Sequence, residues 1–113
     1  MVTGDVWGRH YTEWVETVKA LKRENRLDEA EALLLECCVA TELEAVQNRW
    51  PTPAPWYYSQ LATIYRKRKD REDELAILRR YVREAGRANA AASTRGSRLL
   101  KRLDEMTSAT GEA

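Results

Sequence analysis

The stretch that decides the fold is "PAPWYYSQLATIYRKRKD", residues 53–70, where a proline-rich connector leads into a helical pattern. Pro55 suits the first position of a helix, because the amide hydrogen that proline lacks would be unpaired there anyway. From that point apolar side chains recur every three or four residues, which predicts a helix to about Arg68. The rings of this stretch therefore serve mainly to pack the helix. Its expected apolar face consists of Tyr57, Tyr58, Leu61, Ile64 and Tyr65.

Two helices are predicted before this stretch. Apolar residues on one face predict a helix over residues 11–24. A second helix begins near Leu27 and meets no breaker until Pro51, so it runs for roughly 23 residues. Asn25 is expected to cap this second helix, with Asp28 as the capping partner.

Two more helices are predicted after the stretch. Asp70 is expected to cap a fourth helix, with Asp73 as its partner, and the helix ends near Gly86. A short C-terminal capping helix is expected within residues 93–107, interrupted near its start by Ser, Thr and Gly, and a disordered tail over residues 108–113. No stretch shows the sustained alternation of a half-buried strand, so the predicted fold class is all-α.

The long second helix carries two apolar stripes about 160° apart, at 100° per residue. The first stripe is expected to face the first helix; it comprises Leu27, Ala30, Leu34, Cys37 and Thr41. The second stripe either packs inside the monomer or associates with another molecule, including a second copy of the chain. This candidate self-association set comprises Leu35, Val39, Leu43, Val46 and Trp50.

The composition describes a small soluble domain. The chain has 113 residues and a formal net charge of +1, which excludes a strongly basic nucleic-acid binder of the simplest kind. Residues 1–56 carry 6 basic and 10 acidic side chains, and residues 57–113 carry 13 and 8, so the halves differ in sign. No basic leader with an apolar run is present and no window suits a membrane span, so we expect a cytoplasmic protein without a membrane partner.

Few residues are suited to catalysis or metal binding. His10 is the one histidine, and Cys37 and Cys38 are adjacent cysteines that we expect to be reduced thiols. Three such residues are fewer than the four ligands of a usual structural zinc site, and no glycine-rich loop precedes a lysine. We therefore predict no enzyme activity, no cofactor and no metal. A cysteine nucleophile paired with His10 is the alternative, with Cys38 partly exposed and Cys37 in the core stripe.

The two helix pairs repeat with a shift of 44 residues. The shift aligns Trp14 with Tyr58, Leu21 with Tyr65, Asn25 with Lys69, Leu34 with Leu78, and Cys37 with Tyr81. This pattern resembles the tetratricopeptide repeat family, since Trp14 and Ala30 fill its bulky and small positions and Tyr58, Leu61, Ala62 and Tyr65 match its first-helix signature. The family repeat is usually about 34 residues long, and Glu74 stands where it has a small residue.

The resemblance implies antiparallel helix hairpins stacked in an array, with units over residues 11–50 and 55–86. These units lie in a helical domain of residues 11–92 that follows an N-terminal arm of residues 1–10. Members of the family bind peptides in a groove lined by the first helix of each unit, which implies a protein-binding adaptor or regulator with an acidic partner. The implied groove residues are Lys19, Lys22, Arg23, Trp56, Ser59, Thr63, Arg66 and Lys67.

A nucleic-acid-associated regulator is the alternative function. The run from Arg66 to Lys69 is basic, and lysine and arginine neutralise phosphates while exposed rings stack on bases. The packing face takes most of the rings, so Trp56 or Tyr57 is expected to remain for stacking. Further arginines extend this positive surface along the fourth helix, namely Arg79, Arg80, Arg83 and Arg87.

Overall fold

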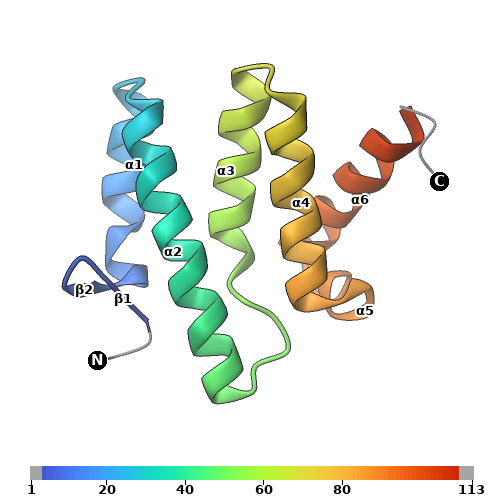
Figure 1. Cartoon of the computed structure of the whole chain (residues 1–113), viewed down its shortest axis with the longest axis horizontal. Coiled ribbons are helices and arrows are strands. Elements are labelled where there is room, and N and C mark those ends of the chain that lie inside the picture. Colours follow the sequence, from blue (N-terminus) through green and yellow to red (C-terminus); the bar gives the residue numbers. More distant parts are fainter. Residues whose placement is uncertain (1–3, 110–113) are drawn as a thin grey trace.

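The structure, a computed structural model, describes residues 4–109, and this part of the chain is mostly helical (Figure 1). The general all-α prediction is therefore confirmed. The elements are β1 (Asp5–Val6), β2 (Arg9–His10), a 3-10 helix (Tyr11–Trp14), α1 (Val15–Arg23), α2 (Leu27–Asn48), α3 (Pro55–Lys67), α4 (Arg71–Ala85), α5 (Arg87–Ala90) and α6 (Thr94–Ala109).

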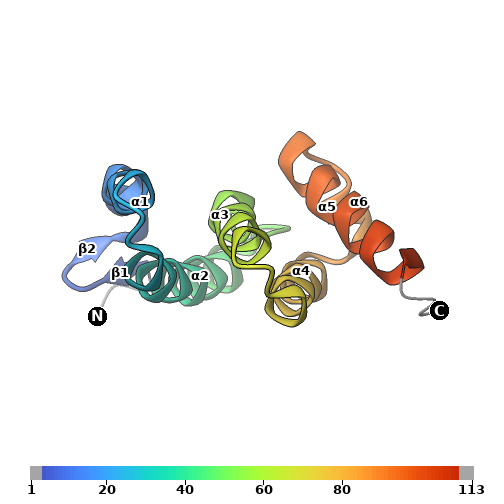
Figure 2. The same ribbon diagram turned by 90° about the horizontal axis from the view of Figure 1, so that it is seen from above.

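The helices form two layers. Figure 2 shows α2 and α4 on one side of the molecule and α1 and α3 on the other, with α6 running obliquely across both levels beyond α4. Helices α1 and α2 run antiparallel, as do α3 and α4, and α6 packs against both α3 and α4 (Figure 1). The core lies between the layers, where the rings of Tyr58 and Tyr81 are fully buried, with their centroids 5.1 Å apart.

The repeat predicted from the sequence is present in the backbone of the two helix-to-helix turns. The amide of Arg26 donates to the carbonyl of Leu21 over 2.8 Å, and 44 residues later the amide of Asp70 donates to the carbonyl of Tyr65 over 2.8 Å. Asn25 and Lys69, the residues before these donors, both have a φ of 58°. A left-handed residue with this hydrogen bond is a common way to end a helix, so both hairpins are closed by the same turn.

The start of α2 differs from the prediction. Arg26 is its N-cap residue and makes no capping bond through its side chain, so Asn25 and Asp28 do not form the expected capping pair. Asn25 instead ends α1 in the left-handed conformation, which asparagine tolerates better than most residues. The parallel prediction for α4 is confirmed at Asp70, whose side chain accepts a hydrogen bond from the amide of Asp73.

The N-terminal arm contains a small β-hairpin that the sequence reading did not predict. Strands β1 and β2 pair antiparallel, and Trp7 and Gly8 between them have φ angles of 49° and 88°. Two consecutive positive φ values are typical of a two-residue hairpin turn. The strands are two residues long, too short to show an alternating pattern. The first predicted helix also begins differently, as a 3-10 turn over Tyr11–Trp14.

The connector between the helix pairs is fixed to α2. Pro55 opens α3 as predicted. The hydroxyl of Thr41, which is buried in α2, accepts a hydrogen bond from the amide of Ala54 over 2.9 Å. Tyr57 is buried as well, so it is not available for stacking on a base, contrary to that part of the prediction.

The C-terminal part is longer and more regular than expected. A short helix, α5, precedes α6, which begins at Thr94 and extends to Ala109, so the expected disordered tail does not begin at residue 108. Residues 110–113 of that predicted tail and residues 1–3 of the arm lie outside the described residues. Gly96 does not interrupt α6. It is buried in the first turn, where a Cβ would lie 2.3 Å from the carbonyl oxygen of Ala90.

Candidate functional site

The most prominent surface feature is an apolar stripe along α2. Among the described residues, the exposed large hydrophobic side chains are Trp7 and four residues of the predicted second stripe. Their exposed fractions are 45% for Val39, 52% for Leu43, 76% for Val46 and 48% for Trp50. Leu35 is partly buried against the core. We call these five, Leu35, Val39, Leu43, Val46 and Trp50, the outer α2 face.

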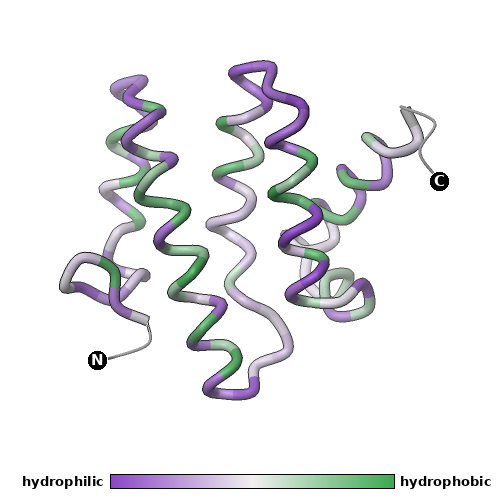
Figure 3. Tube along the Cα trace, viewed as in Figure 1, coloured by the Kyte–Doolittle hydropathy of each residue, from purple (hydrophilic) through white to green (hydrophobic). Residues whose placement is uncertain are grey.

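The opposite side of α2 explains why this face is left open. The first stripe packs into the core as predicted, with Leu34, Cys37 and Thr41 fully buried. In Figure 3 the trace of α2 is largely hydrophobic along its length. Because one stripe already joins α2 to the other helices, the second stripe remains at the surface and the alternative of burial in the monomer is wrong for Val39, Leu43, Val46 and Trp50.

Two of the acidic side chains of α2, Glu31 and Glu42, are held by residues of the neighbouring helix pair. The helix contains six acidic and no basic residues. Glu42 accepts hydrogen bonds from the guanidinium of Arg80 at 2.8 and 2.9 Å and from the hydroxyl of Tyr58 at 2.6 Å. Glu31 is held in the same way by Arg68 and Tyr65, each at 2.7 Å. These contacts neutralise the side of α2 that faces α3 and α4.

A hollow of about 150 Å³ lies beside the outer α2 face, between α2 and α4. Leu35 and Tyr65 form two of its walls, and Ala76 and Ile77 of α4 form the rest of its apolar lining. Arg80 and Asp73 stand at the same hollow, and Arg80 is fixed by its ion pair with Glu42. Sequence reasoning missed this site, because its lining comes from three different helices.

The groove residues implied by the family resemblance lie on α1 and α3, and several of them already have partners. The ammonium of Lys22 donates to the Gln60 side chain at 2.6 Å, and Lys67 lies 3.4 Å from the Asn25 side-chain oxygen. Burial, followed by repulsion from Lys67, lowers the pKa of Lys22, so the structure does bring these two cations near one another.

The remaining groove positions are less convergent. Arg66 turns toward α4 and forms an ion pair with Glu74 at 3.0 Å, while Lys19 contacts Glu16 of its own helix at 3.3 Å. Arg23 is exposed. The Thr63 hydroxyl donates to the carbonyl of Ser59 over 3.0 Å, and Trp56 is half-buried with its ring edge to face against Tyr57.

The basic run of α3 is mostly engaged within the chain. Arg68 contacts Glu31 and Asp28, and Arg66 contacts Glu74. On α4 and beyond, Arg83 lies 3.5 Å from Glu84, and Arg87 lies 3.0 Å from Asp104. These arginines therefore have carboxylate neighbours, which reduces the free positive charge available to a phosphate backbone.

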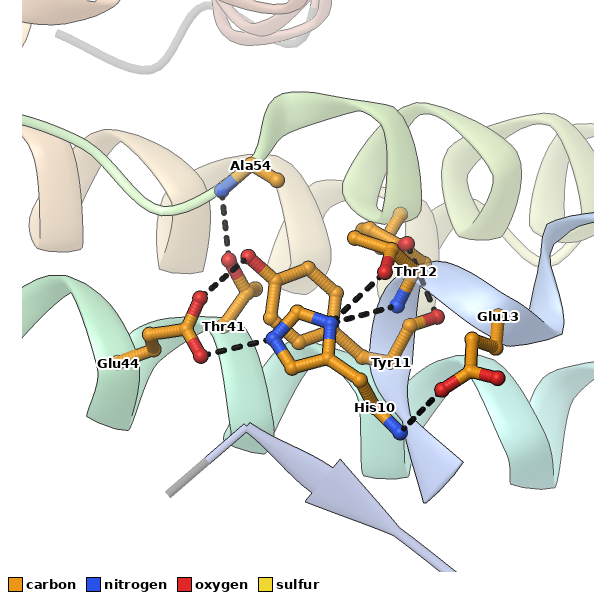
Figure 4. A network of polar contacts seen from close by, with 8 residues as sticks. His10, Tyr11, Thr12, Glu13, Thr41, Glu44 and Ala54 are labelled. Atoms are coloured by element: carbon orange, nitrogen blue, oxygen red, sulfur yellow. Dashed lines mark hydrogen bonds and ion pairs between the residues drawn. The ribbon is translucent and has the colours of Figure 1, made fainter. Parts of the chain in front are cut away.

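The histidine takes part in a polar network that fixes the hairpin to α2 (Figure 4). Nε2 of His10 lies 2.8 Å from a carboxylate oxygen of Glu44, and Nδ1 lies 2.8 Å from the Thr12 hydroxyl. The Tyr11 hydroxyl donates to the other Glu44 oxygen at 3.2 Å. The backbone amide of Thr12 also points at Nδ1, so the ring acts as the cap of the 3-10 helix.

The two cysteines lie apart from the polar network of His10. Cys37 and Cys38 are both fully buried, so the prediction that Cys38 is partly exposed is wrong. Burial raises the pKa of the Cys37 thiol to about 12 and raises that of Cys38 further above its usual range. Thiols of this kind are inert structural residues, and the ring of His10 is bonded to Thr12 and Glu44 instead.

Within residues 4–109, no three histidine, cysteine, aspartate or glutamate side chains are grouped so that they could hold a metal ion. No helix in that range combines the length and apolar character that a bilayer crossing needs.

Comparison with known proteins adds no relative to this picture. The sequence matches no protein-family model, and neither curated proteins nor solved structures give a significant match. The geometry of the chain itself is therefore the basis for a functional proposal.

Proposed function

We propose that this chain is a small, non-catalytic interaction module that docks another protein on its outer α2 face. The observation that carries the proposal is the exposure of Val39, Leu43 and Val46 in a row on one helix. Isolated exposed hydrophobic residues are normal on a protein surface, but a contiguous apolar patch marks an interaction site. Glu31 and Glu42 of α2 are held by Arg68 and Arg80, and the exposed Glu36 lies on the opposite flank of the helix, so none of the three interrupts this row.

The two helix pairs are proposed to be degenerate tetratricopeptide-like units, with α6 as the cap of the array. Support comes from the 44-residue repeat of both sequence and turn hydrogen bonds. In the first unit the small-residue position is the buried Ala30, and in the second it is the buried Glu74. An array of two units leaves an apolar face open, and α6 covers it on the α3–α4 side.

The chain is proposed to act in the cytoplasm, because both cysteines are free thiols and a reducing compartment keeps them so. The same face also suits a homodimer, which the experiment below separates from a foreign partner.

The test uses the full chain with Val39→Glu and Val46→Glu, singly and together. Proteins retained by the tagged wild-type chain are identified, and binding to the recovered partner is then measured for each variant. Ser97→Glu on α6 is the matched control, because it places the same charge on an exposed position of a helix that lies beyond α4 from the outer α2 face. We expect the α2 variants to lose the partner and keep their melting temperature, and the control to keep both.

Light scattering on the same proteins gives the solution mass. A wild-type dimer that Val39→Glu converts to a monomer means that the face binds a second copy. Undiminished partner binding by the double variant would refute the proposal.

Nucleic-acid binding is the alternative, carried by the arginines of α3 and α4. It predicts a steep fall in affinity with salt, because bound lysine and arginine release counterions from phosphates. Retention of single-stranded or duplex nucleic acid with such a salt slope, unchanged by Val39→Glu, would favour this alternative over the interaction module.

A further inference from the structure

We infer that the occupant of the outer α2 face is a single amphipathic helix of another protein, which inserts an apolar anchor side chain into the hollow between α2 and α4 and carries carboxylates on the flank that meets α4. The inference rests on the proposed function and goes on to specify the partner's chemistry. Three observations support it: the hollow, the size of the apolar face and the position of the exposed cations Arg83 and Arg49.

The hollow is suited to one apolar side chain. A cavity of about 150 Å³ lined by aliphatic and aromatic groups is large enough for a benzene molecule. The hollow here has that volume, with Leu35, Tyr65 and Ile77 among its walls. Arg80 at its edge is already paired with Glu42, and Asp73, the other charged residue at the hollow, is exposed to solvent. An apolar anchor therefore displaces no ion pair when it enters.

The face has the dimensions of one helix. From Leu35 to Trp50 it extends about 22 Å at 1.5 Å per residue, or about four turns, and it is one helix wide. A stable dimer of ordinary size buries about 800 Å² on each partner and uses 20–30 residues a side. The five side chains of the outer α2 face are far fewer than the residues that such a dimer interface uses on each side. They match the three or four anchors by which an amphipathic helix docks into a groove.

The exposed arginines near the outer α2 face indicate where the partner helix carries its carboxylates. Arg83 lies one helical turn beyond Arg80 on α4 and is 70% exposed, with only a loose contact of 3.5 Å to the adjacent Glu84. Arg49 is also exposed; it directly follows the end of α2 and precedes Trp50 in the sequence. Both arginines lie toward the end of the face away from the hollow, because Leu35 and Ile77 occupy earlier turns of α2 and α4.

Glu84 is in contact with Arg83, and the other acids near this face lie farther from the two arginines. Asp73 borders the hollow, and Glu36 lies, by its position on the helix, on the flank of α2 opposite to α4. A partner helix with its apolar anchor at the hollow therefore carries one carboxylate about two turns away, where it faces Arg83, and another about four turns away, where it faces Arg49. Acidic residues at the anchor end would instead meet Asp73.

The experiment uses two synthetic helix-stabilised peptides of about four turns. Both peptides carry leucine at i, i+4 and i+7. They differ on one flank, about two turns from the first leucine, where one peptide has glutamate and the other has lysine. Each is titrated against the wild-type chain and three variants, Ala76→Trp, Arg83→Glu and Ser97→Glu. Ala76→Trp fills the hollow from an exposed helix position, so the fold is retained, which thermal unfolding checks.

For the wild type we expect saturable binding, with the glutamate peptide at least about tenfold tighter than the lysine peptide. Ala76→Trp should weaken the binding of both peptides by about tenfold or more, Arg83→Glu should reverse the preference, and Ser97→Glu should change neither the affinity nor the preference. Amide shifts in ¹⁵N-resolved spectra should map to Leu35, Ala76 and Ile77.

Several results would overturn the inference: no saturable binding, equal affinity of the two peptides, or Ala76→Trp binding like the wild type. A wild-type dimer that excludes the peptides would assign the face to a second copy. If Val39→Glu abolishes binding of a recovered natural partner while Ala76→Trp and Arg83→Glu leave it intact, the inference fails and the proposed function stands.

Discussion

Glu74 of α4 and Arg102 of α6 form a two-point contact, with Nε at 2.8 Å from one carboxylate oxygen and Nη2 at 3.1 Å from the other. The same carboxylate accepts a hydrogen bond from Nε of Arg66 on α3 at 3.1 Å. One buried acid thus joins three helices. It occupies the repeat position at which the first unit has Ala30, so a departure from the repeat pattern is what attaches the C-terminal helix.

Replacing this acid should loosen α6. Glu74→Gln is expected to lower the free energy of unfolding by about 3 kcal/mol. This value is at the low end for removing one partner of a buried ion pair, because Arg66 and Arg102 stay partly exposed to water. Urea denaturation measures the change. Asp104→Asn is the control, because the ion pair of Asp104 with Arg87 is exposed at both ends. Its loss should lower the free energy of unfolding by less than about 1 kcal/mol. A change at Glu74 no larger than that of the control would contradict this role.

The stability of the protein should fall in acid. Burial opposes the ionisation of Glu74 and Glu31, but hydrogen bonds to each carboxylate outweigh this effect, so both pKa values lie below the usual range. The donors are Arg102 and Arg66 for Glu74, and Arg68 and Tyr65 for Glu31. The unfolded chain therefore binds more protons in acid than the folded chain does. The stabilisation is complete above the ordinary glutamate pKa of about 4.3 and is lost as the pH falls through the lowered values.

Urea midpoints measured between neutral pH and pH 3 test this expectation. The decline below about pH 4.3 should be shallower in Glu74→Gln, because that variant has lost one of the titrating groups. A pH profile identical to the wild type in that window would show that folding does not lower the pKa of Glu74.

The cysteines should be unreactive in the folded state. Cys37 has a pKa raised to about 12 by burial, so at pH 8 its thiol is almost entirely protonated, and Cys38 is fully buried beside it. A chromogenic disulfide reagent should label neither cysteine in native buffer and both in guanidinium chloride. Rapid labelling of the native chain at either position would mean that α2 opens locally.

The two faces of α2 should respond differently to the same substitution. Leu34→Ala removes a fully buried side chain and is expected to cost about 2–5 kcal/mol. Leu43→Ala, on the outer α2 face and 52% exposed, should change the stability by no more than about 0.5 kcal/mol. Thermal unfolding of the two variants side by side gives the comparison. Equal destabilisation would place Leu43 in a core contact that the fold does not show.

Gly96→Ala should disturb the start of α6 although alanine is the better helix former. The new Cβ would lie 2.3 Å from the backbone oxygen of Ala90, which cannot move aside like a flexible side chain. We expect a loss of at least about 1 kcal/mol, as for overpacking elsewhere. Ser97→Ala, exposed on the same turn, is the control. A stabilised Gly96→Ala variant would show that α6 can shift without cost.

Much of the fold could be predicted from local sequence signals. Pro55 opens α3 and Asp70 caps α4, as expected, because both roles depend on the residue's own backbone chemistry. The cap of α2 was predicted wrongly, since Asn25 can either cap a helix or end one in the left-handed conformation. Local sequence does not distinguish these two uses. The hairpin at Trp7 was missed because its strands are only two residues long.

The candidate site was partly predictable. The sequence by itself determined that α2 has two apolar stripes, because a period of 3.6 residues places side chains on faces whatever surrounds the helix. Only the tertiary structure decided which stripe stays exposed. That choice depends on where α1, α3 and α4 pack, and so does the hollow whose walls come from Leu35, Tyr65 and Ile77 on three helices. Contacts between residues far apart in the chain are formed by packing, and no local pattern encodes them.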